Sequence, residues 1–232
     1  MRDILKSNEN YRLLQANTLV AFFFACKIPP SFILNFYAVN LVMFELKYQT
    51  PKEWADVVLS DFDAFLTDHA AAEKKASGMA MSMISHYPDR KSVVKAMADL
   101  AIEELIHFKQ VLKLINARGG QLGADEKDPY INQIRKVFRN GSDVFFMDRL
   151  IVAGVIEARG YERFSLVAQA LPAGKDKDLY QSIAKSEEKH KNLFIELAYE
   201  YFPKDDVNQR LDEILDIEAD ICMALPFRPA LH

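Results

Sequence analysis

Two Glu-x-x-His pairs are the residues of this chain whose types and spacing point most directly to metal chemistry. Glu104 and His107 form one pair in EELIH, and Glu187 and His190 form the other in EEKH. In an α-helix, residues three apart lie about 60° apart around the axis and ~4.5 Å apart along it. A carboxylate and an imidazole at that spacing can reach one metal ion.

A single glutamate precedes each pair at nearly the same distance. Glu73 lies 31 residues before Glu104, and Glu157 lies 30 residues before Glu187, so the two halves repeat at an offset of 83 to 84 residues. Two antiparallel helix pairs related by a pseudo-twofold axis would produce this repeat. One glutamate from each of two helices and one Glu-x-x-His from each of the other two is the ligand set of carboxylate-bridged di-metal sites. The predicted ligands are Glu73, Glu104, His107, Glu157, Glu187 and His190.

The chemistry of this donor set favours particular metals. Four carboxylates and two imidazoles, with no thiolate, suit iron or manganese better than structural zinc. Small residues near the single glutamates, including Ala76, Ala153 and Gly160, leave room for a bridged metal pair and dioxygen. Gly154 and Gly160 should each cost a helix about 1 kcal/mol relative to alanine, so packing or function must offset them. Each proposed ligand alone could be an ordinary helix residue, and their joint spacing favours the site.

Several neighbours of the ligands allow two interpretations. Glu103 and Glu188 are expected to face solvent, and the alternative for Glu103 is a hydrogen bond that it accepts from a ligand histidine. His69, one turn before Glu73, is expected to be an ordinary core or surface histidine, with a place beside the site as the alternative. Tyr161 either lines a substrate pocket or packs against a neighbouring helix.

The elements that must position these residues are helices, because apolar residues recur at spacings of three and four and no useful stretch alternates with period two. Gly119-Gly120 indicates the C-terminal end of one helix. Ser142 or Asp143 is expected to cap the N-terminal end of another. The pattern predicts an all-α bundle of four long helices with additional short helices. The predicted helices span residues 51–85, 89–118, 130–139, 142–171, 175–201 and 206–224.

Composition limits the class of protein. The chain has 232 residues, with 33 acidic against 29 basic side chains and a formal charge of −4, which argues against a strongly basic nucleic-acid binder but allows a local basic face. Cys26 and Cys222 are isolated, which excludes a CxxC redox or zinc motif and fits a reducing, cytoplasmic location. No unbroken apolar run of about 18 residues occurs, so no membrane span is expected.

The first part of the chain differs from the rest. Residues 18–25 are apolar, but Lys27, Pro29 and Pro30 interrupt the run, and no secretory signal is expected. We interpret residues 1–42 as an N-terminal extension, or as the product of an upstream start codon, in front of a domain that covers residues 43–232.

Four segments of the sequence resemble a known family. They are LTDHAAAEKKAS (66–77), AIEELIHFKQVLKLINARG (101–119), IEARGYERF (156–164) and SEEKHKNLF (186–194). From about Met43 to its last residue, the chain resembles the tRNA 2-methylthio-N6-isopentenyladenosine hydroxylases. The resemblance implies a ferritin-like bundle whose non-haem di-iron site uses dioxygen and electrons to hydroxylate the isopentenyl group of a hypermodified adenosine beside the anticodon. It also implies that the six predicted ligands bind two iron ions.

The resemblance implies two partners. One is tRNA, and the other is a ferredoxin-like or reductase electron donor, because the chain has no nucleotide-binding fingerprint such as GxGxxG. Between Lys109 and Arg149, eight basic residues stand against five acidic ones. We predict that Arg135, Lys136 and Arg139 contact phosphates, and ordinary solvated helix faces are the alternative. The oligomeric state is left open, a monomer included.

Two other functions are compatible with the residues. The first is a ferritin-like di-iron oxygenase that acts on a small-molecule or carrier-bound substrate, against which the basic segment argues. The second is an iron-handling or peroxide-scavenging ferritin-like protein without oxygenase activity. A rubrerythrin would need a Cys-rich module, and this chain has only two cysteines.

Overall fold

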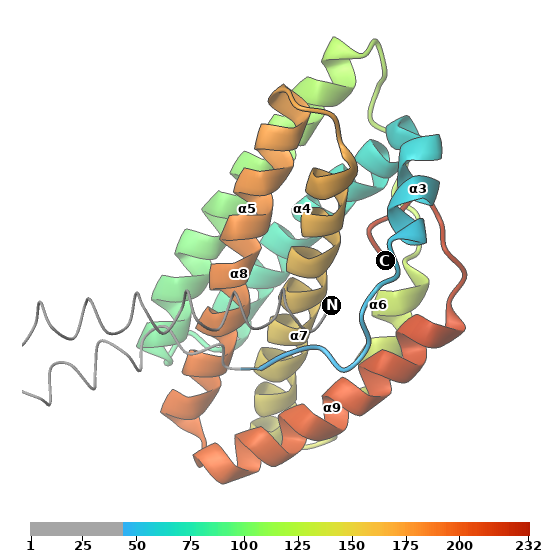
Figure 1. The fold of residues 1–232 in the computed structure, drawn as a ribbon. Helices are drawn as coiled ribbons and strands as arrows, with labels where there is room; N and C mark the ends of the chain where they lie inside the picture. Colours follow the sequence, from blue (N-terminus) through green and yellow to red (C-terminus); the bar gives the residue numbers. More distant parts are fainter. Residues whose placement is uncertain (1–43) are drawn as a thin grey trace, which may run out of the picture. The chain divides into compact units, whose positions relative to one another are not determined.

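Four long helices form the centre of the computed structural model, which describes residues 44–232. They are α4 (Phe62–His86), α5 (Lys91–Ala117), α7 (Ser142–Ala170) and α8 (Lys175–Tyr201) (Figure 1). The described residues contain no strand. The predicted all-α four-helix bundle is therefore confirmed, and the interpretation of residues 1–42 lies outside the described residues.

The four helices form two hairpins. α4 packs along α5, and α7 packs along α8, and each pair is joined by only four residues, so the helices of a pair run antiparallel. α5 ends at Ala117, and the φ of 79° at Gly119 lets the Gly120 amide donate to the Ile115 carbonyl at 3.0 Å. These hairpins are the two halves that the repeat in the sequence predicts.

The first predicted helix is divided in the structure. α3 (Glu53–Ser60) ends before Asp61, whose side chain accepts a hydrogen bond from the Ala64 amide and caps α4. The prediction of one helix over residues 51–85 is wrong because apolar spacing continues across the cap. The predicted cap of α7 is also wrong, because Gly141, with a φ of 116°, precedes the helix and no side chain caps it.

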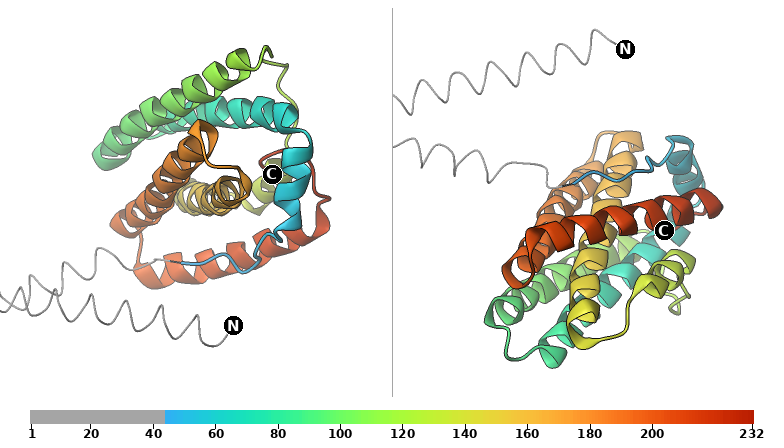
Figure 2. Two further views of the ribbon diagram at one scale, coloured as in Figure 1. Left: turned by 45° about the horizontal axis from the view of Figure 1, so that its top comes forward. Right: turned by 90° about the horizontal axis from the view of Figure 1, so that it is seen from below.

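Three shorter elements surround the bundle. α6 (Pro129–Ile134) is capped by Asp128 and continues into the 3-10 helix η1 (Arg135–Val137). α9 (Lys204–Ala224) lies across the bundle on the side of α7 and α8, away from α4 and α5 (Figure 2). α6 packs against α9, so the two elements form a framework beside α7.

A buried ion pair holds this framework together. The Arg159 guanidinium on α7 donates to both carboxylate oxygens of Glu218 on α9, at 2.8 and 2.9 Å, and neither side chain is exposed to solvent. The Tyr130 hydroxyl on α6 donates to the same carboxylate at 3.2 Å. Breaking one partner of such a pair leaves a buried charge unpaired, so we regard this group as structural.

A hydrophobic core cluster occupies one end of the bundle. Trp54, Phe65, Phe164 and Tyr180 meet there, and the rings of Trp54 and Phe65 pack edge to face with centroids 6.2 Å apart. None of the helices between residues 44 and 232 combines the length and hydrophobicity needed to cross a bilayer.

Candidate metal centre

The six predicted ligands converge in the middle of the bundle. All six side chains are buried, and each comes from the central part of a long helix. Ligand atoms fall into two sets, in each of which they lie within 4.8 Å of one another. Glu104 and Glu187 belong to both sets, as bridging carboxylates between two metal ions would. The sets are Glu73, Glu104, His107 and Glu187, and Glu104, Glu157, Glu187 and His190.

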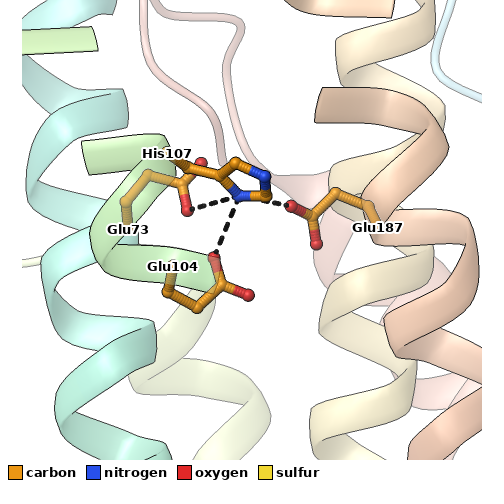
Figure 3. Close-up of side chains that lie close together, drawn as sticks. All are labelled: Glu73, Glu104, His107 and Glu187. Atoms are coloured by element: carbon orange, nitrogen blue, oxygen red, sulfur yellow. Dashed lines mark ion pairs between the residues drawn. The ribbon is translucent and has the colours of Figure 1, made fainter. Parts of the chain in front are cut away.

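The imidazoles lie between the carboxylates. His107 Nδ1 is 3.4 Å from Glu104 Oε2, 3.6 Å from Glu187 Oε1 and 3.7 Å from Glu73 Oε2 (Figure 3). His190 Nδ1 is 3.1 Å from Glu104 Oε1 and 3.2 Å from Glu187 Oε2. Most of these distances exceed those of good hydrogen bonds, so the side chains surround a common centre rather than pairing with one another.

Three atoms of the cluster fit a bound cation. Among the described residues, no group forms a hydrogen bond with Glu104 Oε1, His107 Nδ1 or Glu187 Oε1, although all three atoms are buried. An unsatisfied buried polar group costs about 1–3 kcal/mol, and native proteins contain few of them. A metal ion among these atoms would offset that cost, so the residues present fit the predicted site.

The electrostatics of the metal-free cluster also favour cations. Burial and the neighbouring carboxylates raise the pKa values of Glu157 and Glu187. Burial, aided by Glu73, also raises the pKa of Glu104, although the two neighbouring histidines act against the shift. Two divalent ions, +4 in total, would balance four ionised carboxylates, −4 in total.

The two histidines compensate part of this charge by binding protons. Burial lowers the pKa of His107, but Glu104 and Glu73 outweigh it and raise the pKa to about 9. Glu104 likewise outweighs burial at His190, whose pKa is raised to about 9. In the metal-free protein at neutral pH, protons therefore occupy positions that a metal ion would take.

A buried chain of hydrogen bonds orients Glu73. His69 Nε2 lies 2.6 Å from Glu73 Oε1, and His69 Nδ1 lies 2.9 Å from the Tyr180 hydroxyl. The carboxylate can only accept, so Nε2 carries the proton and Nδ1 accepts from Tyr180. Because burial acts to raise the pKa of Glu73 but the nearby His107 and the hydrogen bond from His69 outweigh it, this pKa lies well below its usual range. His69 is therefore a buried core histidine with both ring nitrogens satisfied, as expected, and it also lies beside the site, which was the alternative.

The structure decides between the two interpretations of two further neighbours. The Glu103 side chain is 51% exposed, but its Oε2 accepts hydrogen bonds from His190 Nε2 at 3.0 Å and from the Ser186 hydroxyl at 3.2 Å. Glu103 therefore fixes the ring of His190 while it faces solvent. Tyr161 lines a separate surface hollow between α7 and α8 and does not line the cavity described below.

The small residues near Glu73 and Glu157 have two roles, which are to let helices approach closely and to leave space beside the cluster. A Cβ atom on Gly154 would lie 3.2 Å from the Lys191 carbonyl oxygen and 3.3 Å from Phe194 Cβ, so this glycine lets α7 approach α8 closely. Ala76, Ala153 and Gly160 border a cavity.

The cavity has a volume of about 650 Å³ and lies between α4 and α7, with α6 and η1 along it. Its walls include four carboxylates of the cluster, Glu73, Glu104, Glu157 and Glu187. Apolar side chains such as Met79, Val152, Ile156 and Phe164 form much of the remaining surface. A substrate in the cavity can therefore reach the candidate metal centre, and apolar side chains line much of its path.

Charged residues border the two ends of the cavity unequally. Arg135, Arg149 and His86 line the end toward the C-terminus of α4, and no acidic residue lines the cavity beside them. The opposite end combines Lys75 and Lys127 with three acidic residues, which are Asp68, Glu126 and Asp128.

The three predicted phosphate contacts have different surroundings. Arg135 and Lys136 are exposed on η1, and Arg135 borders the cavity. Arg139 donates from its guanidinium to Asp148 at 2.8 Å, and its side chain is 40% exposed. Asp148 is buried and also pairs with Arg210 of α9, so Arg139 already has a structural contact.

Comparison with known proteins assigns the family. Residues 38–232 match the family model of tRNA-(MS[2]IO[6]A)-hydroxylase (MiaE). This chain belongs to the MiaE family. The Pseudomonas putida protein named tRNA 2-(methylsulfanyl)-N(6)-isopentenyladenosine(37) hydroxylase is 32% identical over 175 residues, which are 74% of this chain and 83% of that protein. The Salmonella typhimurium protein of the same name is 30% identical over 190 residues, or 77% of this chain and 68% of that protein.

A solved structure is similar to this MiaE family member in fold. It is a Synechococcus protein described as "Protein 43 with aldehyde deformylating oxygenase activity", with a TM-score of 0.78 and 32% sequence identity. The match covers 82% of this chain and 96% of that one. The all-helical fold is thus the ferritin-like four-helix bundle that the sequence predicts.

Proposed function

We propose that this protein hydroxylates the isopentenyl group of 2-methylthio-N6-isopentenyladenosine next to the anticodon in tRNA. The observation that carries the proposal is the cavity, which leads from a basic rim to four clustered carboxylates in a member of the MiaE family. Cationic side chains at the rim suit RNA phosphates, and the apolar interior suits a hydrocarbon chain.

The six clustered residues hold two iron ions in this proposal. Glu73, Glu104, His107 and Glu187 would hold one ion, and Glu104, Glu157, Glu187 and His190 would hold the other, because their ligand atoms form these two sets. The bound iron supplies the redox chemistry that activates dioxygen, which no amino-acid side chain can perform. The surrounding protein contributes orientation and exclusion of water.

Residues around the cluster orient its ligands and shape the substrate cavity. Tyr180 and His69 fix the Glu73 carboxylate, and Glu103 fixes the His190 ring. Because Ala153 and Gly160 present little or no side chain, an isopentenyl group has room beside the carboxylates. A positioned C–H bond in a dry cavity limits competing reactions of the activated oxygen.

The proposal includes the partners and the location. An external ferredoxin-like or reductase protein supplies electrons, and tRNA places the reaction in the cytoplasm. Arg135 and Lys136 contact RNA phosphates, with Arg139 as a weaker candidate because Asp148 already holds its guanidinium. All six ligands and the cavity come from one chain, so a monomer is sufficient for the site.

Nucleoside analysis of cellular tRNA tests the proposed function. Deleting the gene should abolish the hydroxylated isopentenyl nucleoside and leave its unhydroxylated precursor, as measured by mass spectrometry. Wild-type protein should restore the product, and the Glu104→Ala variant should not. Persistence of the hydroxylated nucleoside after deletion would refute the proposal.

A second candidate function follows from the Synechococcus structure, whose description names activity on aldehydes. Its identity to this chain equals that of the Pseudomonas putida relative, and the largely apolar cavity could hold an aliphatic aldehyde. The basic rim favours RNA. Incubating the iron-loaded protein with a long-chain aldehyde distinguishes the two, because formate release without RNA hydroxylation would favour the second candidate.

A further inference from the structure

Two phenylalanines stand at the basic end of the cavity. Phe145, in the first turn of α7, is 37% exposed, although large apolar side chains normally avoid water. Phe138, directly after η1, packs edge to face against it, with ring centroids 5.4 Å apart. Both side chains line the cavity, together with Arg135 and Arg149.

Hydrogen bonds to Asp148 fix the backbone next to Phe138. The amide and guanidinium of Arg139, next to Phe138, both donate to Asp148, which is buried on α7 and also binds Arg210. The two rings therefore sit on a fixed segment between η1 and α7. An exposed, rigid aromatic surface beside guanidinium groups is typical of proteins that stack unpaired nucleobases.

Distances along α7 indicate which base the pair would contact. Arg149 precedes Glu157 by eight residues and Phe145 precedes it by 12, or ~12 and ~18 Å along the axis at 1.5 Å per residue. A purine with its isopentenyl group extends ~10 Å, at covalent bond lengths near 1.5 Å. A nucleoside whose side chain reaches the cluster thus ends near Arg149, and Phe145 lies beyond it.

We propose that Phe145 and Phe138 form a stacking platform for the base that flanks the modified adenosine in the anticodon loop, while Arg149 and Arg135 bind the adjoining phosphates. The inference rests on the proposed function and deepens it, because it assigns the end of the cavity at which RNA enters. The charge distribution agrees, since the acidic residues Asp68, Glu126 and Asp128 border the other end.

A matched pair of variants tests the platform. Phe145→Ala should weaken binding of an anticodon stem–loop that carries 2-methylthio-N6-isopentenyladenosine by roughly 10-fold, measured by fluorescence anisotropy, whereas Phe145→Trp should retain binding. Phe227→Ala is the control, because Phe227 is 38% exposed and does not line the cavity. The salt dependence of binding should persist in Phe145→Ala and flatten in Arg149→Ala, since only the second removes a charge.

The free nucleoside separates a flanking-base contact from a general defect. The single nucleoside has no flanking base, so Phe145→Ala should reduce its hydroxylation much less than it reduces hydroxylation of the stem–loop. Equal RNA affinities of wild type and Phe145→Ala, or equal losses with RNA and nucleoside, would overturn the platform alone. A wild-type protein that neither binds nor hydroxylates the stem–loop would instead refute the proposed function, and the platform with it.

Discussion

The contact between α7 and α8 at Gly154 leads to a quantitative prediction about stability. Replacing glycine by alanine inside a helix stabilises it by about 0.8–1 kcal/mol when the methyl group meets nothing. Gly78 of α4 meets that condition, because no atom outside its own helix backbone and chain neighbours lies within 4 Å of a Cβ built there. Gly78→Ala should therefore raise the free energy of unfolding by about 1 kcal/mol.

Gly154→Ala should behave in the opposite way. Its methyl group would meet the Lys191 carbonyl oxygen at 3.2 Å and two side-chain atoms of α8 at 3.3 Å, and a backbone carbonyl cannot rotate away. Overpacking of this kind costs about 1–3 kcal/mol, which cancels or exceeds the gain in helix propensity. The two variants should thus differ by about 1–3 kcal/mol. Because Lys191 follows His190, the displaced α8 should also bind metal more weakly.

Urea unfolding of both variants, with iron content measured in parallel, checks this reasoning. The unfolding slope should stay unchanged, so that the midpoints report stability. Thermal midpoints should shift by about 2–4 °C per kcal/mol for a domain of this size. If Gly154→Ala proved as stabilising as Gly78→Ala and bound iron normally, the close approach of α7 and α8 would not be what requires glycine there.

Three further predictions concern the metal centre and the RNA surface. Glu104→Ala should lose iron, measured by elemental analysis, while its circular dichroism stays helical; full iron occupancy would refute the ligand assignment. Replacing Arg135, Lys136 and Arg139 together with alanine should weaken binding of the stem–loop and flatten its salt dependence without loss of iron. Unchanged affinity would rule out contact of these residues with phosphates. The pKa values of about 9 at both clustered histidines lie above the ordinary value of about 6.5, so the metal-free fold binds extra protons and should lose stability as pH rises from 6.5 to 9. Iron binding must displace these protons, and a calorimetric titration without proton release would contradict that assignment.

The sequence predicts the bundle and the cluster because both depend on local periodicity. Glu104 and His107 share a helix face whatever the tertiary packing, and the repeat at residues 73 and 157 adds the other two helices. The apolar pattern alone does not reveal the helix break at Asp61, because an aspartate within a continuing pattern looks like any other polar residue of a helix. The feature that could indicate the break is the preference of aspartate for the N-cap position, since a second apolar run follows it.

Contacts between distant segments could not be predicted in the same way. The Tyr180 hydroxyl meets His69 across 111 residues, and Arg159 meets Glu218 across 59. Neither pairing leaves a spacing pattern in the sequence. The pairing of Arg139 with Asp148 likewise depends on how η1 meets α7, so counting charges alone overstates the cations available to RNA.

Labelling with oxygen-18 tests whether the protein inserts an oxygen atom from dioxygen into the isopentenyl group. Iron-loaded protein should be given an electron donor, the modified anticodon stem–loop and dioxygen labelled with oxygen-18, and the nucleosides should then be analysed by mass spectrometry. We expect one labelled oxygen atom in the isopentenyl group, and none with the Glu104→Ala variant. An unhydroxylated nucleoside, or a hydroxyl group whose oxygen came from water, would contradict that expectation.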